Sequence, residues 1–333
     1  MNPPIHPRIA LFEPEEALPA ALPVCDHYAG TEPRMTKSLQ LQAEMGPVFD
    51  VTLDNEDGAP VGGEVDQAQL IVALLNGPHN RYGRVGVRLL PVAHPRFADV
   101  AAIVVASARA PAYLMLPKPT GLADVQRAAQ AIDALGGGAI PLHALIETHG
   151  ALRDVFAIAE HPRLESLSFG LMDFVSAHKG AIPQSAMRGA GQFDHPLVVR
   201  AKLEIAAACH AANKVPSHCV FTEFKDTQAL QAAAEMASQL LGYTRMWSIH
   251  PSQIRPIVDA FAPTVAEVDQ AIAIIVAAQA AQWAPISHTF SHDDTKQLHD
   301  RASYRYFWQV IERAHRTAPD KAIPAELRAA WFG

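Results

Sequence analysis

The stretch LESLSFGLMDFV at residues 164–175 shows the pattern that decides the fold. Residues up to Gly170 are mostly apolar or small, which is typical of a strand covered on both faces, as in a parallel sheet. A carboxylate, Asp173, follows shortly after this strand. An acid at the carboxyl end of a buried strand either caps the next helix or belongs to a site.

The same pattern recurs along the chain, with alanine-rich helical stretches between short apolar runs. It predicts strands at residues 24–29, 48–54, 85–90, 112–117, 141–147, 164–169, 216–221 and 246–250. Alternation of such strands with helices indicates a parallel sheet. Eight units in succession favour a closed (β/α)8 TIM barrel. An open doubly wound sheet is the alternative, but no GxGxxG follows the first strand.

The pattern changes after about residue 260, so we predict a barrel catalytic domain over residues 1–260 and a C-terminal helical extension over 261–333. Within the extension, the sequence predicts one long helix over 260–283, a polar loop over 285–300 and an aromatic helix over 302–316. Exposed aromatic side chains would form an adhesive patch. We therefore expect the extension to pack on its own barrel or on a neighbouring subunit of a homo-oligomer.

The composition of the 333 residues excludes several classes of protein. The net charge is −7 and no basic patch is visible, so no nucleic-acid partner is expected. The three cysteines, Cys25, Cys209 and Cys219, form no CxxC pair, which fits a reducing compartment. The first residues do not resemble a signal peptide, and the most apolar stretch is interrupted by Glu267 and Asp269. We expect a cytoplasmic protein without a membrane partner.

Polar side chains gather where the predicted strands end, and in a parallel barrel these ends meet at one mouth. The set consists of Asp54, Glu56, Asp57, Arg88, Lys118, Glu147, Asp173 and His250. Each has an ordinary structural explanation, such as a helix cap for Asp173 or an ion pair for Arg88. Their occurrence at successive strand ends favours a common site.

Two carboxylates are a typical protein contribution to a Mg²⁺ site, where substrate and water supply the other ligands. Glu147 and Asp173 come from adjacent predicted strands, whose backbones lie about 4.8 Å apart, so they could share one cation. Oxygen ligands favour Mg²⁺ or Mn²⁺ over zinc. Gly170 leaves space there, and the amides of Leu171 and Met172 could donate to a bound anion.

The sequence gives weaker support to other chemistries. His288 and His292 are four residues apart, but they lie in the predicted loop, and no HExxH or Cys/His zinc motif occurs. We expect His250 to line a strand end and Cys219 to be a small core residue. Neither GxSxG nor a P-loop is present, so a serine hydrolase or nucleotide hydrolase has no support.

Six segments together resemble motifs of a known family. They are LDNEDGAP at 53–60, VRLL at 87–90, LMLPK at 114–118, ALIET at 144–148, SFGLMDF at 168–174 and MWSIHPSQI at 246–254. In this order they resemble the citrate lyase β-subunit-like group of the HpcH/HpaI aldolase superfamily, which includes malyl-CoA, citramalyl-CoA and β-methylmalyl-CoA lyases. The resemblance covers residues 24–260.

The resemblance implies a TIM barrel in which Glu147 and Asp173 hold Mg²⁺ and Arg88 binds the carboxylate of an α-keto acid. It places Glu56 and Asp57 beside the metal and its waters. It also places Lys118 near the same pocket. The implied reaction is cleavage of a 3-hydroxyacyl-CoA to acetyl-CoA and an α-keto acid, which suits a metal that polarises the hydroxyl oxygen. The family likeness also implies a homo-oligomer, a trimer or hexamer.

Two segments depart from the family pattern. The first strand reads CDHYAGTEPR, without the usual arginine, and places Asp26 and His27 there. Asp300 only loosely matches a C-terminal aspartate that serves as proton donor in a neighbouring subunit's site. Two alternatives therefore stay open. One is an aldolase acting on free hydroxy-keto acids, and the other is a non-catalytic barrel that binds keto acids.

Overall fold

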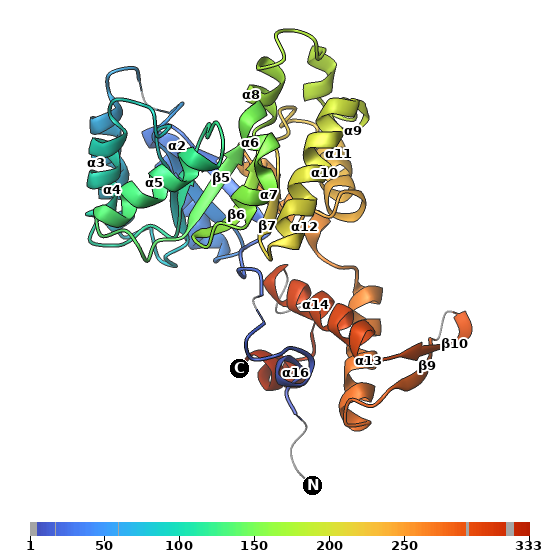
Figure 1. Ribbon diagram of the computed structural model, residues 1–333. Helices are drawn as coiled ribbons and strands as arrows, with labels where there is room; N and C mark the ends of the chain where they lie inside the picture. Colours follow the sequence, from blue (N-terminus) through green and yellow to red (C-terminus); the bar gives the residue numbers. More distant parts are fainter. Residues whose placement is uncertain (1–4, 17, 59, 291–292, 318–322) are drawn as a thin grey trace. The chain divides into compact units, whose positions relative to one another are not determined.

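The computed structural model describes residues 5–16, 18–58, 60–290, 293–317 and 323–333. The chain forms two compact units, one of residues Pro19–Phe261 and one that joins the residues up to Leu18 to Ala262–Gly333 (Figure 1). The N-terminal segment thus belongs with the C-terminal unit, whereas the sequence was divided only near residue 260. We describe each unit by itself.

The first unit is a closed barrel of eight parallel strands in sequence order, so the predicted TIM barrel is confirmed. The strands are β1 Cys25–Ala29, β2 Asp50–Asp54, β3 Val85–Arg88, β4 Leu114–Leu116, β5 Leu142–Ile146, β6 Leu164–Phe169, β7 Val215–His218 and β8 Arg245–Ser248. Strand β8 pairs with β1 and closes the barrel. The register places Asp54 beside Arg88, at the carboxyl ends of β2 and β3.

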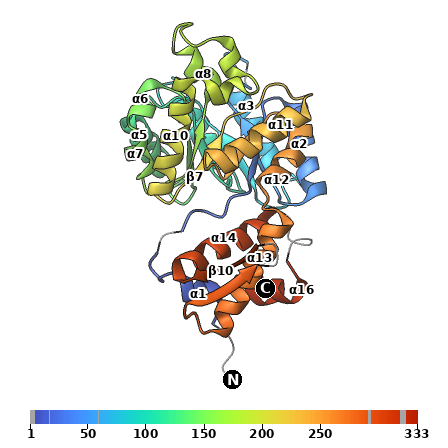
Figure 2. The same ribbon diagram turned by 90° about the vertical axis from the view of Figure 1, so that its right-hand side faces the viewer.

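Helices and short helical turns connect and surround these strands (Figures 1 and 2). They are α2 Glu32–Met45, α3 Glu64–Asn76, α4 Phe97–Val105, α5 Leu122–Ala134, α6 His149–Arg153, α7 Val155–Ala159, α8 Leu171–Ser176, η1 Gln184–Met187, α9 Gly191–Asp194, α10 Pro196–Ala211, α11 Thr227–Glu235, η2 Met236–Leu240 and α12 Pro251–Phe261.

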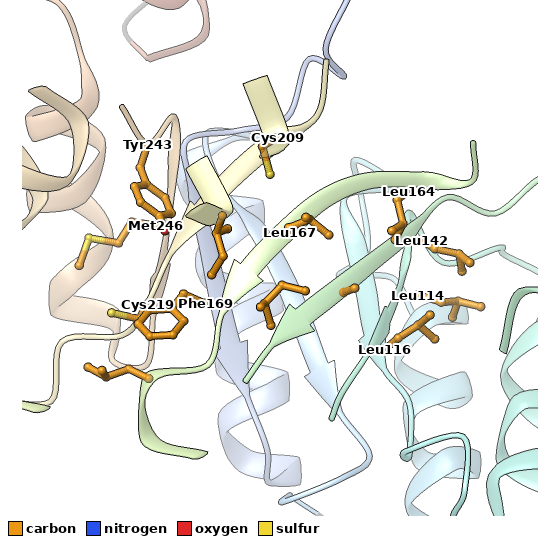
Figure 3. Packing of buried hydrophobic residues seen from close by; sticks show 14 of the residues in the cluster. Leu114, Leu116, Leu142, Leu164, Leu167, Phe169, Cys209, Cys219, Tyr243 and Met246 are labelled. Carbon is orange, nitrogen blue, oxygen red and sulfur yellow. The ribbon is translucent and has the colours of Figure 1, made fainter. Parts of the chain in front are cut away.

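Apolar side chains fill the layer between strands and helices, which explains why the strands read as continuous apolar runs. Figure 3 shows Leu114, Leu142 and Leu164 on neighbouring strands, and all three are buried. Further along β6, Leu167 and Phe169 extend the same packing. Burial on both strand faces is the property of parallel barrels on which the sequence prediction relied.

A buried charged network fills part of the barrel interior. Arg245 is fully buried, and its Nη1 lies 2.6 Å from Asp50 while its Nη2 lies 3.1 Å from Asp26. The hydroxyls of Thr52 and Tyr113 also donate to Asp26, at 2.7 and 3.0 Å. The unusual acid of the first strand is therefore the partner of a buried arginine inside the barrel, which gives it a structural role.

A second buried cation, Lys202, lies on α10. Its Nζ donates to Oε1 of Gln192 at 3.1 Å and lies 4.0 Å from the centre of the Phe193 ring. Among the described residues no carboxylate forms an ion pair with it. Burial lowers the pKa of Lys202 to about 8. Because an ordinary lysine titrates near 10.4, this lowering corresponds to a cost of about 3 kcal/mol for keeping the charge in the folded protein.

We therefore expect Lys202→Met to raise the free energy of unfolding at pH 7 by about 1–3 kcal/mol, since an apolar side chain replaces an uncompensated charge. Wild-type stability should itself rise between about pH 8 and pH 10, where the folded lysine is neutral and the unfolded one still protonated. Urea unfolding across this range measures both effects. Lys37→Met, at an exposed position of α2, is the control. A loss of stability in Lys202→Met would contradict the argument.

The second unit contains α1 Pro7–Leu11, α13 Val265–Ala280, β9 Ile286–Phe290, β10 Asp293–His299, α14 Arg301–Thr317 and α16 Ala325–Phe332. It has its own core, in which Leu11 and Phe12 from the N-terminal segment join Ile275 of α13 and Trp308 of α14. No single helix among the described residues is both long and apolar enough to cross a membrane. The adjoining α12 and α13 reach that length and composition only as a bent pair.

Three expectations for this unit are wrong. The helix predicted over 260–283 is interrupted, because Thr264 and Glu267 form a capping box that starts α13 at Val265. The predicted polar loop over 285–300 is a two-stranded antiparallel sheet of β9 and β10. Most aromatic side chains of α14, including Tyr304 and Trp308, are buried within the unit, although Tyr306 is exposed. The inference of an oligomer from exposed aromatic residues therefore loses its basis.

Candidate active site

The polar side chains predicted at the strand ends do meet at the mouth of the barrel. Arg88 ends β3, Lys118 follows β4, Glu147 follows β5, Asp173 lies in the first turn of α8 after β6, and Glu56 and Asp57 lie in the loop after β2. Ion pairs and hydrogen bonds connect all six side chains directly or through one another. The sequence prediction of a shared site is consistent with this geometry.

Arg88 is buried at the centre of an acidic cluster. Its Nε lies 2.6 Å from Asp54, its Nη1 3.0 Å from Glu56 and its Nη2 2.9 Å from Asp57. Its guanidinium carbon also lies 5.1 Å from the centre of the Tyr28 ring. Each guanidinium nitrogen thus faces a carboxylate. Of the three acids Asp57 is the most exposed, with 57% of its side-chain surface accessible.

Two residues that hold Arg88 were not assigned to the site from the sequence. Asp54 accepts a hydrogen bond of 2.6 Å from the Tyr28 hydroxyl and further bonds from the amides of Glu56 and Gly58, so it also fixes the loop after β2. The sequence analysis named Asp54 only as a strand-end acid and did not single out Tyr28. The period of two in a strand was the available signal, because it places Tyr28 on the same face as Asp26, inside the barrel.

Lys118 connects the two halves of the acidic cluster. Its amide donates to Glu147 at 2.8 Å, and its Nζ lies 2.5 Å from Glu56 and 3.8 Å from Asp173. The backbone of Lys118 has a φ of 48°, in the left-handed region that side chains other than glycine rarely adopt. Such strain is typical of functional sites, where surrounding contacts impose it. Here it lets one residue contact both Glu147 and Glu56.

The electrostatics of Glu147 and Asp173 suit a divalent cation. Burial, and to a lesser extent the charge of Asp173, raises the pKa of Glu147 to about 8. With all acids ionised, the mouth carries five carboxylates against Arg88 and Lys118, a formal charge of −3. Among the described residues no group of three or more His, Cys, Asp or Glu side chains could hold a metal. A site of two carboxylates therefore fits Mg²⁺, which takes its remaining ligands from substrate and water.

Gly170 is required for Glu147 to reach its position. A Cβ atom on Gly170 would lie 2.1 Å from Oε2 of Glu147 and 2.5 Å from its Cβ. Beside it, Leu171 is buried and Met172 exposed at the start of α8, where backbone amides lack partners within the helix. Their role as donors to an anion stays a prediction.

Gly170→Ala should therefore displace the Glu147 carboxylate without unfolding the barrel. We expect the affinity for Mg²⁺ to fall at least about tenfold, because a misplaced ligand no longer fits the near-ideal octahedral geometry that this ion demands. Calorimetric titration with Mg²⁺ measures the change. Gly138→Ala is the matched control, since its nearest neighbouring atom would be 3.6 Å from the new Cβ. Equal Mg²⁺ affinity in both variants would contradict the predicted position of Glu147.

The remaining predicted residues lie elsewhere. Asp300 belongs to the second unit, where its carboxylate accepts hydrogen bonds from the amides of Ala302 and Ser303 at the start of α14. The His250 ring stacks on Phe224, with 4.7 Å between ring centres, and its Nδ1 bonds the Ser252 hydroxyl. Cys219 is buried, as expected. The proposed histidine pair cannot be described, because His292 lies outside the described residues.

The fold and this mouth define a TIM-barrel enzyme whose site combines paired carboxylates with an arginine and a lysine. Residues 30–251 match the family model described as HpcH/HpaI aldolase/citrate lyase, so the chain belongs to that family. Proteins of this family include lyases. The resemblance inferred from the sequence motifs is confirmed.

Individual relatives agree with this assignment. A crystal structure of a citrate lyase from Burkholderia xenovorans is 52% identical, with a TM-score of 0.83 over 98% of this chain and 100% of that one. The L-malyl-CoA/β-methylmalyl-CoA lyase of Cereibacter sphaeroides is 27% identical over 250 residues, 70% of this chain and 77% of the relative. The CitE protein of Mycobacterium tuberculosis, solved with magnesium, acetoacetate and coenzyme A, shares the fold at 20% identity, with a TM-score of 0.68 over 88% of this chain and 98% of that one.

Proposed function

We propose that this protein is a Mg²⁺-dependent carbon–carbon lyase that cleaves a 3-hydroxyacyl-CoA of the malyl-CoA or citramalyl-CoA type to acetyl-CoA and an α-keto acid. The observation that carries the proposal is the network at the barrel mouth. There, Lys118 contacts both proposed metal ligands, Glu147 and Asp173, and also contacts Glu56, which pairs with Arg88. The malyl-CoA lyase relative and the complexes of the mycobacterial protein support the choice of substrate and metal.

In this proposal Glu147 and Asp173 hold Mg²⁺, with Mn²⁺ as a possible substitute. The ion, when bound, supplies Lewis acidity to the oxygen that changes from hydroxyl to carbonyl. The buried Glu147 and the half-exposed Asp173 face the mouth from adjacent strands, so the ion keeps open positions for substrate oxygens.

Arg88 would orient the carboxylate next to the reacting hydroxyl through its planar fork of donors. Cleavage breaks the carbon–carbon bond beside the hydroxyl carbon. The hydroxyl proton then passes to a base, for which Glu56 or Asp57 are the candidates, and the bonding pair goes to the thioester enolate. The enolate carbon must then take a proton to become acetyl-CoA. We assign this step to Asp300 from a neighbouring subunit of a trimer or hexamer.

The test is turnover of malyl-CoA and citramalyl-CoA with product keto acid and free CoA measured separately. We expect keto acid and acetyl-CoA to form with Mg²⁺, activity to disappear with EDTA, and Mg²⁺ to restore it. Activity that survives both chelation and Glu147→Gln would exclude the metal role. Release of pyruvate from a free hydroxy-keto acid without any thioester would favour an aldolase. Binding of keto acid without cleavage of any substrate would favour a non-catalytic barrel.

A further inference from the structure

A second hollow opens on the carboxyl-end face of the barrel, outside the network of acids. It has a volume of about 480 Å³ and is lined mainly by Gln184, Ser185, Arg188, Phe221, Glu223 and Asp226. One wall is η1 and the segment before α9, which follow β6, and the other is the loop after β7. Helix η1 contacts α8, the helix that carries Asp173 (Figure 1). The hollow therefore adjoins the β6 side of the mouth, across the barrel from Arg88 on β3.

The walls of the hollow are held in place by buried contacts. Gly191 allows its segment to lie against Ser185, because a Cβ there would be 2.1 Å from the Ser185 carbonyl oxygen. Directly after it, the fully buried Gln192 accepts hydrogen bonds from Lys202 on α10 and from the Cys219 thiol beyond β7. The Gln192 side chain thus joins both walls, and its Nε2 is buried without a partner.

The charges of the lining limit what the hollow can bind. Arg188 lies 3.9 Å from Glu223, and the carboxylate of Asp226 accepts a hydrogen bond from the amide of Ala229. With one cation and two acids the lining carries a net negative charge, which disfavours phosphate groups. Glutamine, serine and carboxylate groups instead offer donors and acceptors to neutral amides and hydroxyls. The volume is within the range of small-ligand sites.

We propose that this hollow binds the amide-bearing pantetheine arm of the acyl thioester, while the nucleotide of CoA lies outside it. The inference rests on the proposed function, because the arm would extend from the mouth on the side opposite the carboxylate that Arg88 holds. An arm of this chemistry occurs in CoA and in acyl carrier proteins, so the hollow alone would accept either source.

The test uses Ser185→Trp, which fills the hollow from an exposed position, with Gln130→Trp at an exposed position of α5 as control. Binding to the full chain is measured by calorimetry with pantetheine, CoA and adenosine 3′,5′-bisphosphate, and Mg²⁺ is titrated separately. We expect Ser185→Trp to weaken pantetheine and CoA at least about tenfold, with Mg²⁺ affinity unchanged. The nucleotide without the arm should bind both variants equally.

Unchanged affinity of Ser185→Trp for pantetheine would overturn the inference, and so would a selective loss of the nucleotide. These binding measurements do not need turnover, so they remain informative if no thioester is cleaved and the proposed function fails. Where cleavage occurs, CoA and acyl-carrier thioesters are compared as substrates. A rise in KM in Ser185→Trp for both thioesters, with kcat little changed, supports the arm as the shared element.

Discussion

Glu147→Gln is expected to lower kcat/KM for the thioester substrate by about 1,000-fold or more and to weaken Mg²⁺ binding at least tenfold. Glutamine has the same shape and can still accept the Lys118 amide bond, which is 2.8 Å long in the structure. It removes only the negative charge. Because we assign just two carboxylates to the ion, the loss of one charge should be felt directly in both binding and catalysis.

Stability separates this effect from simple damage to the fold. Burial beside Asp173 raises the pKa of Glu147 to about 8, so its ionisation in the folded protein is unfavourable. A neutral glutamine avoids that cost, and the melting temperature should stay equal or rise. Glu204→Gln, which alters an exposed ion pair with Arg200 on α10, is the control and should keep full activity. Retained Mg²⁺ affinity in Glu147→Gln would remove Glu147 from the metal site.

The barrel could be predicted from the sequence because its physical cause is visible there. A strand covered on both faces needs an apolar run, and each run is followed by a helix. The predicted strand over 164–169 coincides with β6, whereas that over 112–117 shortens to Leu114–Leu116 in β4. Strand ends depend on backbone pairing with neighbours, which no local pattern records.

The second unit could be predicted less well. Strand β10 carries polar residues and an exposed Leu298, so no core-facing alternation marks it as a strand. The aromatic face of α14 does have apolar partners, but one of them, Leu11, lies nearly the whole chain away. Sequence periodicity identifies an apolar face and does not show which distant segment covers it.

Within the candidate site, the location of the acids followed from the barrel rule, but their interactions did not. That Arg88 contacts three carboxylates depends on the loop after β2, which Asp54 holds through two backbone amides. Such side-chain networks depend on loop geometry that residue types alone do not specify. The same holds for Asp26, whose burial beside Arg245 gives the altered first strand a structural explanation.

The contacts of Arg88 also define what a substrate must do. A substrate carboxylate can reach the guanidinium only by displacing one of the acids that now face it. Asp54 is fully buried and Glu56 nearly so, whereas more than half of the Asp57 side-chain surface is accessible. We infer that Asp57 gives way, since its movement costs the least burial. Arg88 would then bind Asp54 and the substrate at the same time, through different nitrogens.

Only a guanidinium can serve both, because its donors point in fixed and different directions. We therefore expect Arg88→Lys to lower kcat/KM by about 1,000-fold, mainly through loss of the oriented substrate contact. Arg88→Met should do at least the same and also destabilise the fold by about 3–5 kcal/mol, because the buried Asp54 would lose its cation. Steady-state kinetics and urea unfolding of both variants separate the two effects. Arg255→Lys, in an exposed pair with Asp259, provides the control. If Arg88→Lys keeps its stability and activity within tenfold of the wild type, the positive charge alone suffices, and the bidentate role of Arg88 is wrong.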